Sequence, residues 1–326
     1  TLREIKDRPF FLGVGFLNPP RSVNGFESDS NLYMMPAGSA AFRVSDRLTL
    51  GMGLGGLSGM GVDFSDTMAV PGNQAVVTTK QFFKVAPGFA YRVGDALSLG
   101  ATINLNYQSL ALATPAYALP QNQVFGWGAS LGLVWKPADT VQIGATWTSE
   151  ANMDKFEWNT VAGRFAMRMN APQNFALGLA WRPAPGWLVE GDVKRIRFSD
   201  VLDAVSVDRP TGYVGPIPAV LNFGWSDQTV YAIALQKDIG ANTQFRIGLN
   251  YGASPIGPED VNSNFGSLAV VEKHIALGLT RKFNEKVSGS ISYVHAAKNS
   301  VTSNVAPFNT IELQQNIVNL QIGYQF

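Results

Sequence analysis

Long runs of alternating side chains constrain the fold of this chain most strongly. Residues 97–108 (LSLGATINLNYQ) place apolar residues at odd positions and small or polar residues at even positions. The same alternation recurs in residues 124–135, 174–181, 245–252 and 318–326. Because successive side chains of a strand point to opposite faces, each run has one apolar face and one polar or small face. The chain is therefore predicted to be all-β.

Three features favour a transmembrane antiparallel β-barrel over a soluble sandwich. The alternating runs extend over about 10 to 15 residues, whereas strands of soluble proteins usually have about 5 to 6. Charged residues make up only 15% of the chain, against about 25% in soluble domains. Aromatic residues lie near the ends of the apolar faces, as in the interfacial girdles of membrane barrels. These aromatics are Tyr91, Tyr107, Trp135, Trp147, Trp181, Trp187, Tyr251, Tyr324 and Phe326.

Short and long connections alternate along the chain, which predicts fourteen strands with short periplasmic turns and long extracellular loops. The predicted strands are 9–18, 32–44, 47–60, 81–93, 96–110, 123–136, 140–152, 173–183, 186–200, 227–238, 242–252, 271–283, 286–298 and 312–326. The predicted long loops are 19–31, 61–80, 111–122, 153–172, 201–226, 253–270 and 299–311. Closure is expected, because an open edge in lipid would leave backbone groups without partners.

Composition excludes several classes of function. The net charge of +1 gives no reason to expect a nucleic-acid partner. Without cysteine, the chain has no thiolate metal site, cysteine nucleophile or disulfide. No signal peptide is expected, and the chain has no apolar run of about 18 residues, so no transmembrane helix is expected either. His274 and His295 have no triad-like sequence neighbourhood, and we expect no enzyme, cofactor or metal.

The third predicted strand is heavily interrupted by glycine. In residues 48–61 (LTLGMGLGGLSGMG) the alternation slips at Gly55-Gly56, with Gly53 and Gly59 nearby. Glycine in a strand marks a bulge, a bend or a close approach. The alternative is that these glycines relieve crowding against large neighbouring side chains.

Two sets of side chains are candidates for ligand binding. The long loops carry an apolar set that either forms a binding surface or packs the loops together: Leu112, Tyr117, Leu119, Phe156, Trp158, Val161, Phe165, Met167 and Met169. Three cations fall on the polar faces of their strands, which face the lumen in a barrel, and they could bind a carboxylate: Lys84, Lys194 and Arg246. Alternatively, Glu190 and Asp192 neutralise Lys194 and Arg246.

Several segments in order resemble the FadL-type outer-membrane transporters of fatty acids and hydrocarbons. They are residues 82–107, 171–201, 222–236, 245–256 and 272–283, and the resemblance extends from about residue 31 to the end. It implies a monomeric barrel in the bacterial outer membrane, among its lipids and lipopolysaccharide. It also implies passive uptake of a hydrophobic compound, captured on loops 111–122 and 153–172 and released sideways at the kinked third strand.

One departure from the family concerns its amino-terminal plug. Residues 1–8 precede the first predicted strand, and Asn18-Pro19-Pro20 falls in the first predicted loop and does not match the family's Asn-Pro-Ala signature. We therefore expect a short remnant at 1–8 without a plug and a single barrel domain at 9–326. The sequence does not distinguish among fatty acids, alkanes and aromatic compounds as the cargo. The alternative functions are a general pore for polar solutes, a barrel lipid hydrolase and a structural scaffold.

Overall fold

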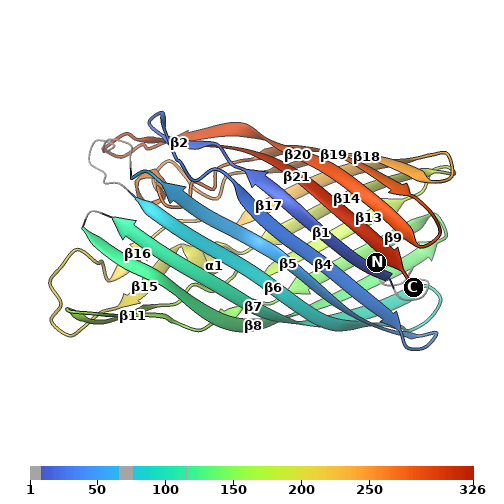
Figure 1. Cartoon of the computed structure of the whole chain (residues 1–326), viewed down its shortest axis with the longest axis horizontal. Coiled ribbons are helices and arrows are strands. Elements are labelled where there is room, and N and C mark those ends of the chain that lie inside the picture. Colours follow the sequence, from blue (N-terminus) through green and yellow to red (C-terminus); the bar gives the residue numbers. More distant parts are fainter. Residues whose placement is uncertain (1–8, 66–75, 115) are drawn as a thin grey trace.

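Fourteen antiparallel strands of the described residues close into one barrel (Figure 1). The computed structural model describes residues 9–65, 76–114 and 116–326. The barrel strands are β1 (Pro9–Asn18), β4 (Tyr33–Arg43), β5 (Leu48–Asp63), β6 (Val77–Arg92), β7 (Leu97–Thr114), β8 (Tyr117–Ala138), β9 (Val141–Thr148), β13 (Asn174–Trp181), β14 (Trp187–Ile196), β17 (Gln228–Ile239), β18 (Thr243–Gly252), β19 (Lys273–Lys282), β20 (Val287–Thr302) and β21 (Thr310–Gln325). Each coincides with one of the predicted strands, so the predicted fold class is confirmed.

The barrel closes between its first and last strands. β1 pairs with β21 along its whole length, from Pro9–Gln325 to Asn18–Asn316, and with β4 along its other edge. Both marked ends of the chain lie at the end of the barrel that carries the short turns, and the long connections lie at the opposite end (Figure 1). Short turns face the periplasm in barrels of this kind, so the long connections are extracellular.

The two faces of the wall carry opposite side chains, as the alternation predicts. On β7 and β8, Ile103 and Trp127 are 57% and 61% exposed on the outer surface, whereas the neighbouring Asn104 is 3% exposed. Cross-strand partners share a face, so the register carries this pattern around the barrel. The outer band is therefore apolar and suited to lipid. Among the described residues, no helix has the length and apolar character needed to cross a membrane.

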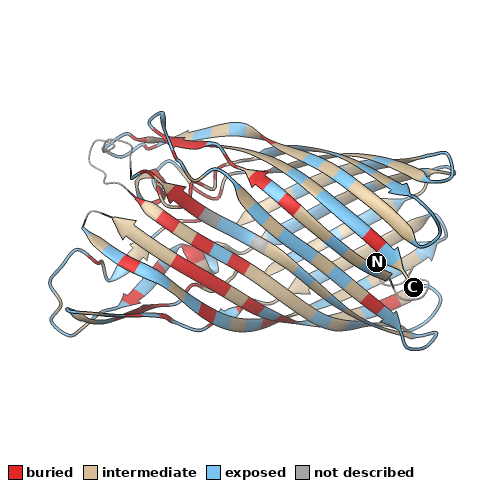
Figure 2. Cartoon of the chain, viewed as in Figure 1, coloured by how far each residue is buried: buried red, intermediate tan, exposed pale blue. Residues whose placement is uncertain are grey.

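Extra structure is concentrated at the extracellular end. Short strands β2 (Arg21–Val23), β3 (Phe26–Glu27) and β10 (Asn152–Met153) extend the barrel sheet. A separate sheet contains β11 (Phe156–Thr160), β12 (Gly163–Met167), β15 (Ala204–Asp208) and β16 (Val220–Asn222). The short helix α1 (Ser199–Leu202) directly precedes β15, and the 3-10 turn η2 (Val261–Ser263) lies in the loop between β18 and β19. Buried residues gather toward this end (Figure 2). We call the loops and the separate sheet here the extracellular cap.

Three predicted loops are shorter than expected, because the strands beside them continue beyond the apolar band. One of them is loop 299–311, which β20 enters as far as Thr302. β7 and β8 form a hairpin that reaches Thr114 and Tyr117, inside the predicted loop 111–122. β6 begins at Val77, inside the predicted loop 61–80. The cap packs against the inner side of these extensions, for example at Leu110 and Leu119. The predicted remnant at residues 1–8 lies outside the described residues.

Candidate functional site

The ladder between β4 and β5 stops partway along the wall. Its pairs run from Arg43–Thr49 to Ala37–Gly55. β4 continues to Tyr33 and still pairs with β1, and β5 continues to Asp63 and still pairs with β6. Pro36 is the first β4 residue beyond the ladder, and proline, which lacks an N–H, is typical of a strand edge. We call the unpaired stretch between these strands the seam.

A bulge in β5 begins where the ladder stops. β5 pairs with β6 through Gly56–Phe83 and resumes at Ser58–Phe82, so Leu57 is an extra residue in the backbone. The extra residue exchanges the two faces of the strand. Leu54, before the bulge, is 44% exposed, whereas Val62, after it, is fully buried. The slip in the sequence alternation is thus a bulge.

The wall beside the seam is hollowed by a cavity of about 470 Å³. Its lining includes Met35, Asn319 and Gln321, whose register places them on the lumen side. It also includes Leu54 and Leu320, which are exposed on the outer surface. The cavity therefore has lining residues from both faces of the wall, and its volume is in the range of small-molecule sites.

The glycines at the seam are not needed to relieve crowding at the two positions nearest the end of the ladder. A Cβ atom added at Gly53 or Gly55 would meet no atom within 4 Å. At Gly56 the nearest atom would be a ring carbon of Phe83 at 3.6 Å, and at Gly59 the carbonyl of Lys80 at 3.9 Å. Without a side chain there, Gly53 and Gly55 leave open space on the lumen side of the seam.

Two of the predicted cations are lysines that face the lumen, and one of them lies beside this space. Lys84 is the register partner of Gly55 on β6, and Lys194 faces the lumen from β14. Within the described part of the chain, neither lysine forms an ion pair, and the predicted partners Glu190 and Asp192 form none either. Two of the three predicted cations thus face the lumen without an ion pair to a carboxylate in the described residues.

Arg246, the third predicted cation, is fully engaged by neutral groups. Its guanidinium donates hydrogen bonds to Gln236 (2.7 Å), Thr280 (2.8 Å) and Gln244 (2.8 Å). The expected pairing with Glu190 or Asp192 is absent among the described residues. Arg246 therefore has a structural network of its own.

The apolar loop residues pack mainly against one another. Phe156, Trp158, Phe165, Met167 and Met169 are each at most 5% exposed. The rings of Phe156 and Trp158 stack at 5.9 Å. Leu119 is buried as well, Leu112 and Tyr117 pack against the cluster, and Val161 is fully exposed at the β11–β12 turn. The arrangement agrees with the alternative of loops packed together, and a ligand role for these residues stays a prediction.

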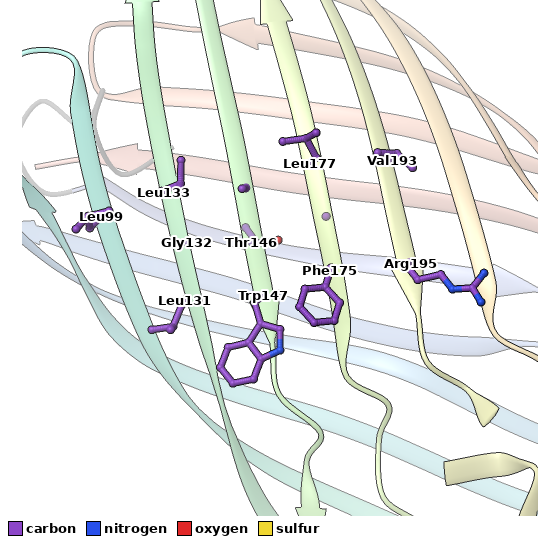
Figure 3. Close-up of a pocket in the computed structure, with 12 residues that line it drawn as sticks. Leu99, Leu131, Gly132, Leu133, Thr146, Trp147, Phe175, Leu177, Val193 and Arg195 are labelled. Carbon is purple, nitrogen blue, oxygen red and sulfur yellow. The ribbon is translucent and has the colours of Figure 1, made fainter. Parts of the chain in front are cut away.

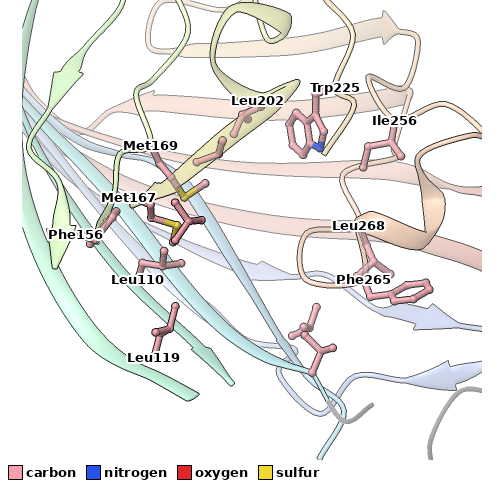
Figure 4. Packing of buried hydrophobic residues seen from close by; sticks show 14 of the residues in the cluster. Leu110, Leu119, Phe156, Met167, Met169, Leu202, Trp225, Ile256, Phe265 and Leu268 are labelled. Carbon is pink, nitrogen blue, oxygen red and sulfur yellow. The ribbon is translucent and has the colours of Figure 1, made fainter. Parts of the chain in front are cut away.

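Other loops contribute residues that the sequence reasoning missed. Figure 4 shows Trp225, Ile256, Phe265 and Leu268 in the same cluster as Met167. Loop 253–270 bends onto the inner wall, where Thr78 of β6 donates a hydrogen bond to the Gly266 carbonyl at 2.9 Å. The available signal was the apolar content of residues 253–270, which is high for a solvated loop. The cap therefore has an apolar core that reaches the inner wall of the barrel.

A second hollow of about 530 Å³ faces away from the lumen. It lies on β8, β9, β13 and β14 and is lined by outward side chains such as Leu131, Trp147 and Phe175 (Figure 3). Ladders on both sides of these strands are continuous at this level. The hollow is therefore a depression in the lipid-facing surface.

The two histidines do not form a catalytic arrangement with serine in the described residues. His295 Nδ1 lies 2.9 Å from Asn316 Oδ1. His274 faces the lumen, and its Nδ1 is buried without a hydrogen-bond partner. Nucleophilic catalysis requires a nucleophile within hydrogen-bond reach of its base, and neither residue meets this condition.

Solved structures of transport barrels share this fold. The toluene transporter TodX of Pseudomonas putida matches with a TM-score of 0.79 and 19% identity, over 100% of this chain and 91% of that one. A FadL homologue of Pseudomonas aeruginosa matches with a TM-score of 0.82 and 12% identity, over 100% and 92%. The toluene transporter TbuX of Ralstonia pickettii matches with 0.76 and 17%, over 99% and 91%. No curated protein sequence matches the chain.

The closed barrel and its apolar outer band define the protein as an outer-membrane β-barrel. Residues 21–319 match the sequence profile of the outer membrane protein transport protein family (OMPP1/FadL/TodX). The chain belongs to this family, so the resemblance seen in the sequence is confirmed. Its location is the outer membrane, and its general function is transport.

Proposed function

We propose that the protein moves hydrophobic compounds passively from the extracellular side into the outer membrane through the seam between β4 and β5. The observation that carries the proposal is the cavity at the interrupted ladder, with lining residues from both faces of the wall. An apolar solute gains free energy on leaving water for the bilayer. A side exit serves such a solute better than a water-filled tube.

The membrane supplies a physical reason for this assignment. Unpaired backbone groups at membrane depth cost several kcal/mol each unless they line a cavity or are buried in protein. The seam exposes two strand edges, and the cavity lies against them. A gap that admits solvent or cargo explains how these edges persist in a barrel that is otherwise closed.

Entry is proposed at the extracellular cap, through loops 111–122 and 153–172. The apolar core there would have to part around a ligand. Met167 and Met169 belong to this core, and methionine side chains adapt readily to different apolar shapes. The same apolar core argues against a general pore for polar solutes, which needs a polar constriction.

Two classes of cargo are supported by different observations. Two of the similar structures carry names that describe toluene transporters, which favours a neutral aromatic. Lys84 and Lys194, unpaired with carboxylates in the described residues, favour a cargo with a carboxylate group. We propose that the seam admits both classes and that the lysines assist only the acidic one.

A substitution that fills the open space tests the side exit. Gly55→Leu adds a side chain where no atom lies within 4 Å. We expect uptake of toluene and oleate to fall about tenfold, equivalent to about 1.4 kcal/mol added to the barrier. Uptake is measured in a Gram-negative host that lacks its own transporter for these compounds, at equal surface amounts of barrel.

Gly144→Leu is the matched control. Gly144 lies in β9, four strands along the barrel from β5, and the nearest atom to a Cβ added there is at 3.9 Å. The strands beside it are paired on both sides. Unchanged uptake in Gly55→Leu, or an equal loss in Gly144→Leu, would contradict a route through the seam.

A further inference from the structure

The seam is closed again at its extracellular end by a tyrosine. The hydroxyl of Tyr33, at the end of β4, donates a hydrogen bond to the carbonyl of Gly61 in β5 at 2.9 Å. This contact crosses the gap beyond the last ladder pair, Ala37–Gly55. The residue facing it is glycine, and a Cβ added at Gly61 would lie 2.9 Å from the Tyr33 hydroxyl. The absence of a side chain at Gly61 therefore makes room for the hydroxyl.

A buried arginine fixes the position of this hydroxyl. Arg21 of β2 is 7% exposed and donates to the Tyr33 hydroxyl at 2.6 Å and to the Ser30 carbonyl at 2.8 Å. Its guanidinium also lies over the Tyr33 ring, 5.6 Å from the centroid. In the described part of the chain it has no carboxylate partner, and its Nε is buried without a hydrogen bond.

The cost of this arrangement indicates that it has a role. Burying a cation without a carboxylate is unfavourable, and its hydrogen bonds and the aromatic ring compensate only in part. β2 pairs with β21 at Arg21–Leu313, so the arginine ties the tyrosine to a strand outside the seam. The backbone of Asp29 adds a hydrogen bond to the Asp63 carbonyl just above, at 2.9 Å.

We propose that Tyr33, positioned by Arg21, sets the extracellular limit of the side opening and thereby the width of the cargo that passes. This inference rests on the proposed exit through the seam. The unpaired stretch of β5 between Gly55 and Gly61 is the span available to a solute. Releasing Tyr33 from Gly61 lengthens that span toward Asp63, and a wider cargo gains more from the change than a narrow one.

The test compares a narrow and a wide neutral solute, toluene and biphenyl, in the transporter-deficient host. Tyr33→Phe removes the hydroxyl and keeps the ring. We expect the biphenyl-to-toluene uptake ratio to rise about threefold, in line with the loss of the single hydrogen bond that crosses the seam to Gly61. Arg21→Lys is expected to raise the ratio as well. The double variant should raise the ratio no further than the larger of the two single effects, because both substitutions act through the contact between Tyr33 and Gly61.

Tyr293→Phe is the matched control. Tyr293 also joins neighbouring strands through its hydroxyl, which donates to Asn316 at 2.8 Å, but there the ladder is continuous. This variant should leave the ratio unchanged, whereas a change in folding that follows the loss of any tyrosine hydroxyl would alter both variants alike. An equal rise in Tyr293→Phe would overturn the assignment to Tyr33.

Combination with Gly55→Leu separates the two proposals. If Gly55→Leu lowers uptake and Tyr33→Phe leaves the ratio unchanged, the role of Tyr33 is wrong and the side exit stands. If Gly55→Leu does not lower uptake, the side exit itself is wrong. A rise in the ratio that persists in the Gly55→Leu background would also overturn the role of Tyr33, because the effect would then bypass the seam.

Discussion

At the scale of single residues, Lys84 and Lys194 show what the alternation along a strand can predict and what it cannot. Alternation along β6 and β14 places both side chains in the lumen, as predicted. It does not identify their partners, so the lack of an ion pair at either lysine in the described residues and the engagement of Arg246 by Gln236 and Thr280 emerge only in three dimensions. Alternation predicts which face of its strand a side chain occupies, whereas its contacts with other strands depend on the assembled barrel.

Replacing the lumen lysines should separate the two classes of cargo. Lys84→Met and Lys194→Met are each expected to lower oleate uptake about tenfold, because hydrogen bonds to a charged group contribute about 1.5–3 kcal/mol. Toluene uptake should be unchanged, since toluene has no charge. Lys237→Met, which removes a lysine stacked on Trp187 at 4.3 Å, is the control. Equal losses for oleate and toluene would contradict a role in carboxylate binding.

At the scale of single elements, β5 was predictable in part. The glycines and the slip in alternation predict a break near Gly55-Gly56, and the bulge lies there. The end of the β4–β5 ladder was not predictable, because pairing depends on two strands and Pro36 gives the only local hint in β4. Tyr33 was also missed, since a tyrosine at a strand end fits the aromatic girdle equally well.

The cap shows a second limit of pattern reasoning. The apolar residues of loop 153–172 were recognised, but they have no period that distinguishes a binding surface from a packed interior. Their partners, such as Ile256 and Leu268, come from a loop about a hundred residues away in sequence. Burial of the loops was therefore decided by long-range contacts.

Trimming the cap core should loosen the cap and leave the barrel intact. Trp158→Ala removes a buried ring and the hydrogen bond from its Nε1 to the Pro120 carbonyl at 2.7 Å. Large-to-small changes of this kind cost about 3–5 kcal/mol. We expect faster proteolysis of the extracellular loops in intact cells. Val161→Ala, at a fully exposed position in the same hairpin, should not change the rate. Equal cleavage rates in the two variants would contradict a packed cap.

For the whole molecule, strand number and orientation were predictable because lipid imposes simple requirements. Every strand must be paired, and outward side chains must be apolar. Alternating connection lengths then gave the count, and the β1–β21 pairing completes the barrel. Strand segments beyond the apolar band, such as the β7–β8 extension, pack against the cap and not against the membrane. The sequence therefore predicted their ends less accurately.

Reversible closure of the seam tests the central claim most directly. The Cβ of Met35 lies 3.8 Å from the Cβ position of Gly56, a separation typical of a disulfide. The chain has no cysteine of its own, so Met35→Cys/Gly56→Cys offers a single cross-link. Ala234→Cys/Gly248→Cys, with a corresponding separation of 3.7 Å in a paired part of the opposite wall, is the control.

Uptake of toluene is to be measured for both pairs before oxidation, after oxidation and after reduction, with the cross-link verified by mass spectrometry. The account predicts that oxidation stops uptake through the Met35–Gly56 pair, that reduction restores it, and that the control pair transports equally in both states. Undiminished uptake with the Met35–Gly56 bond fully formed would contradict it.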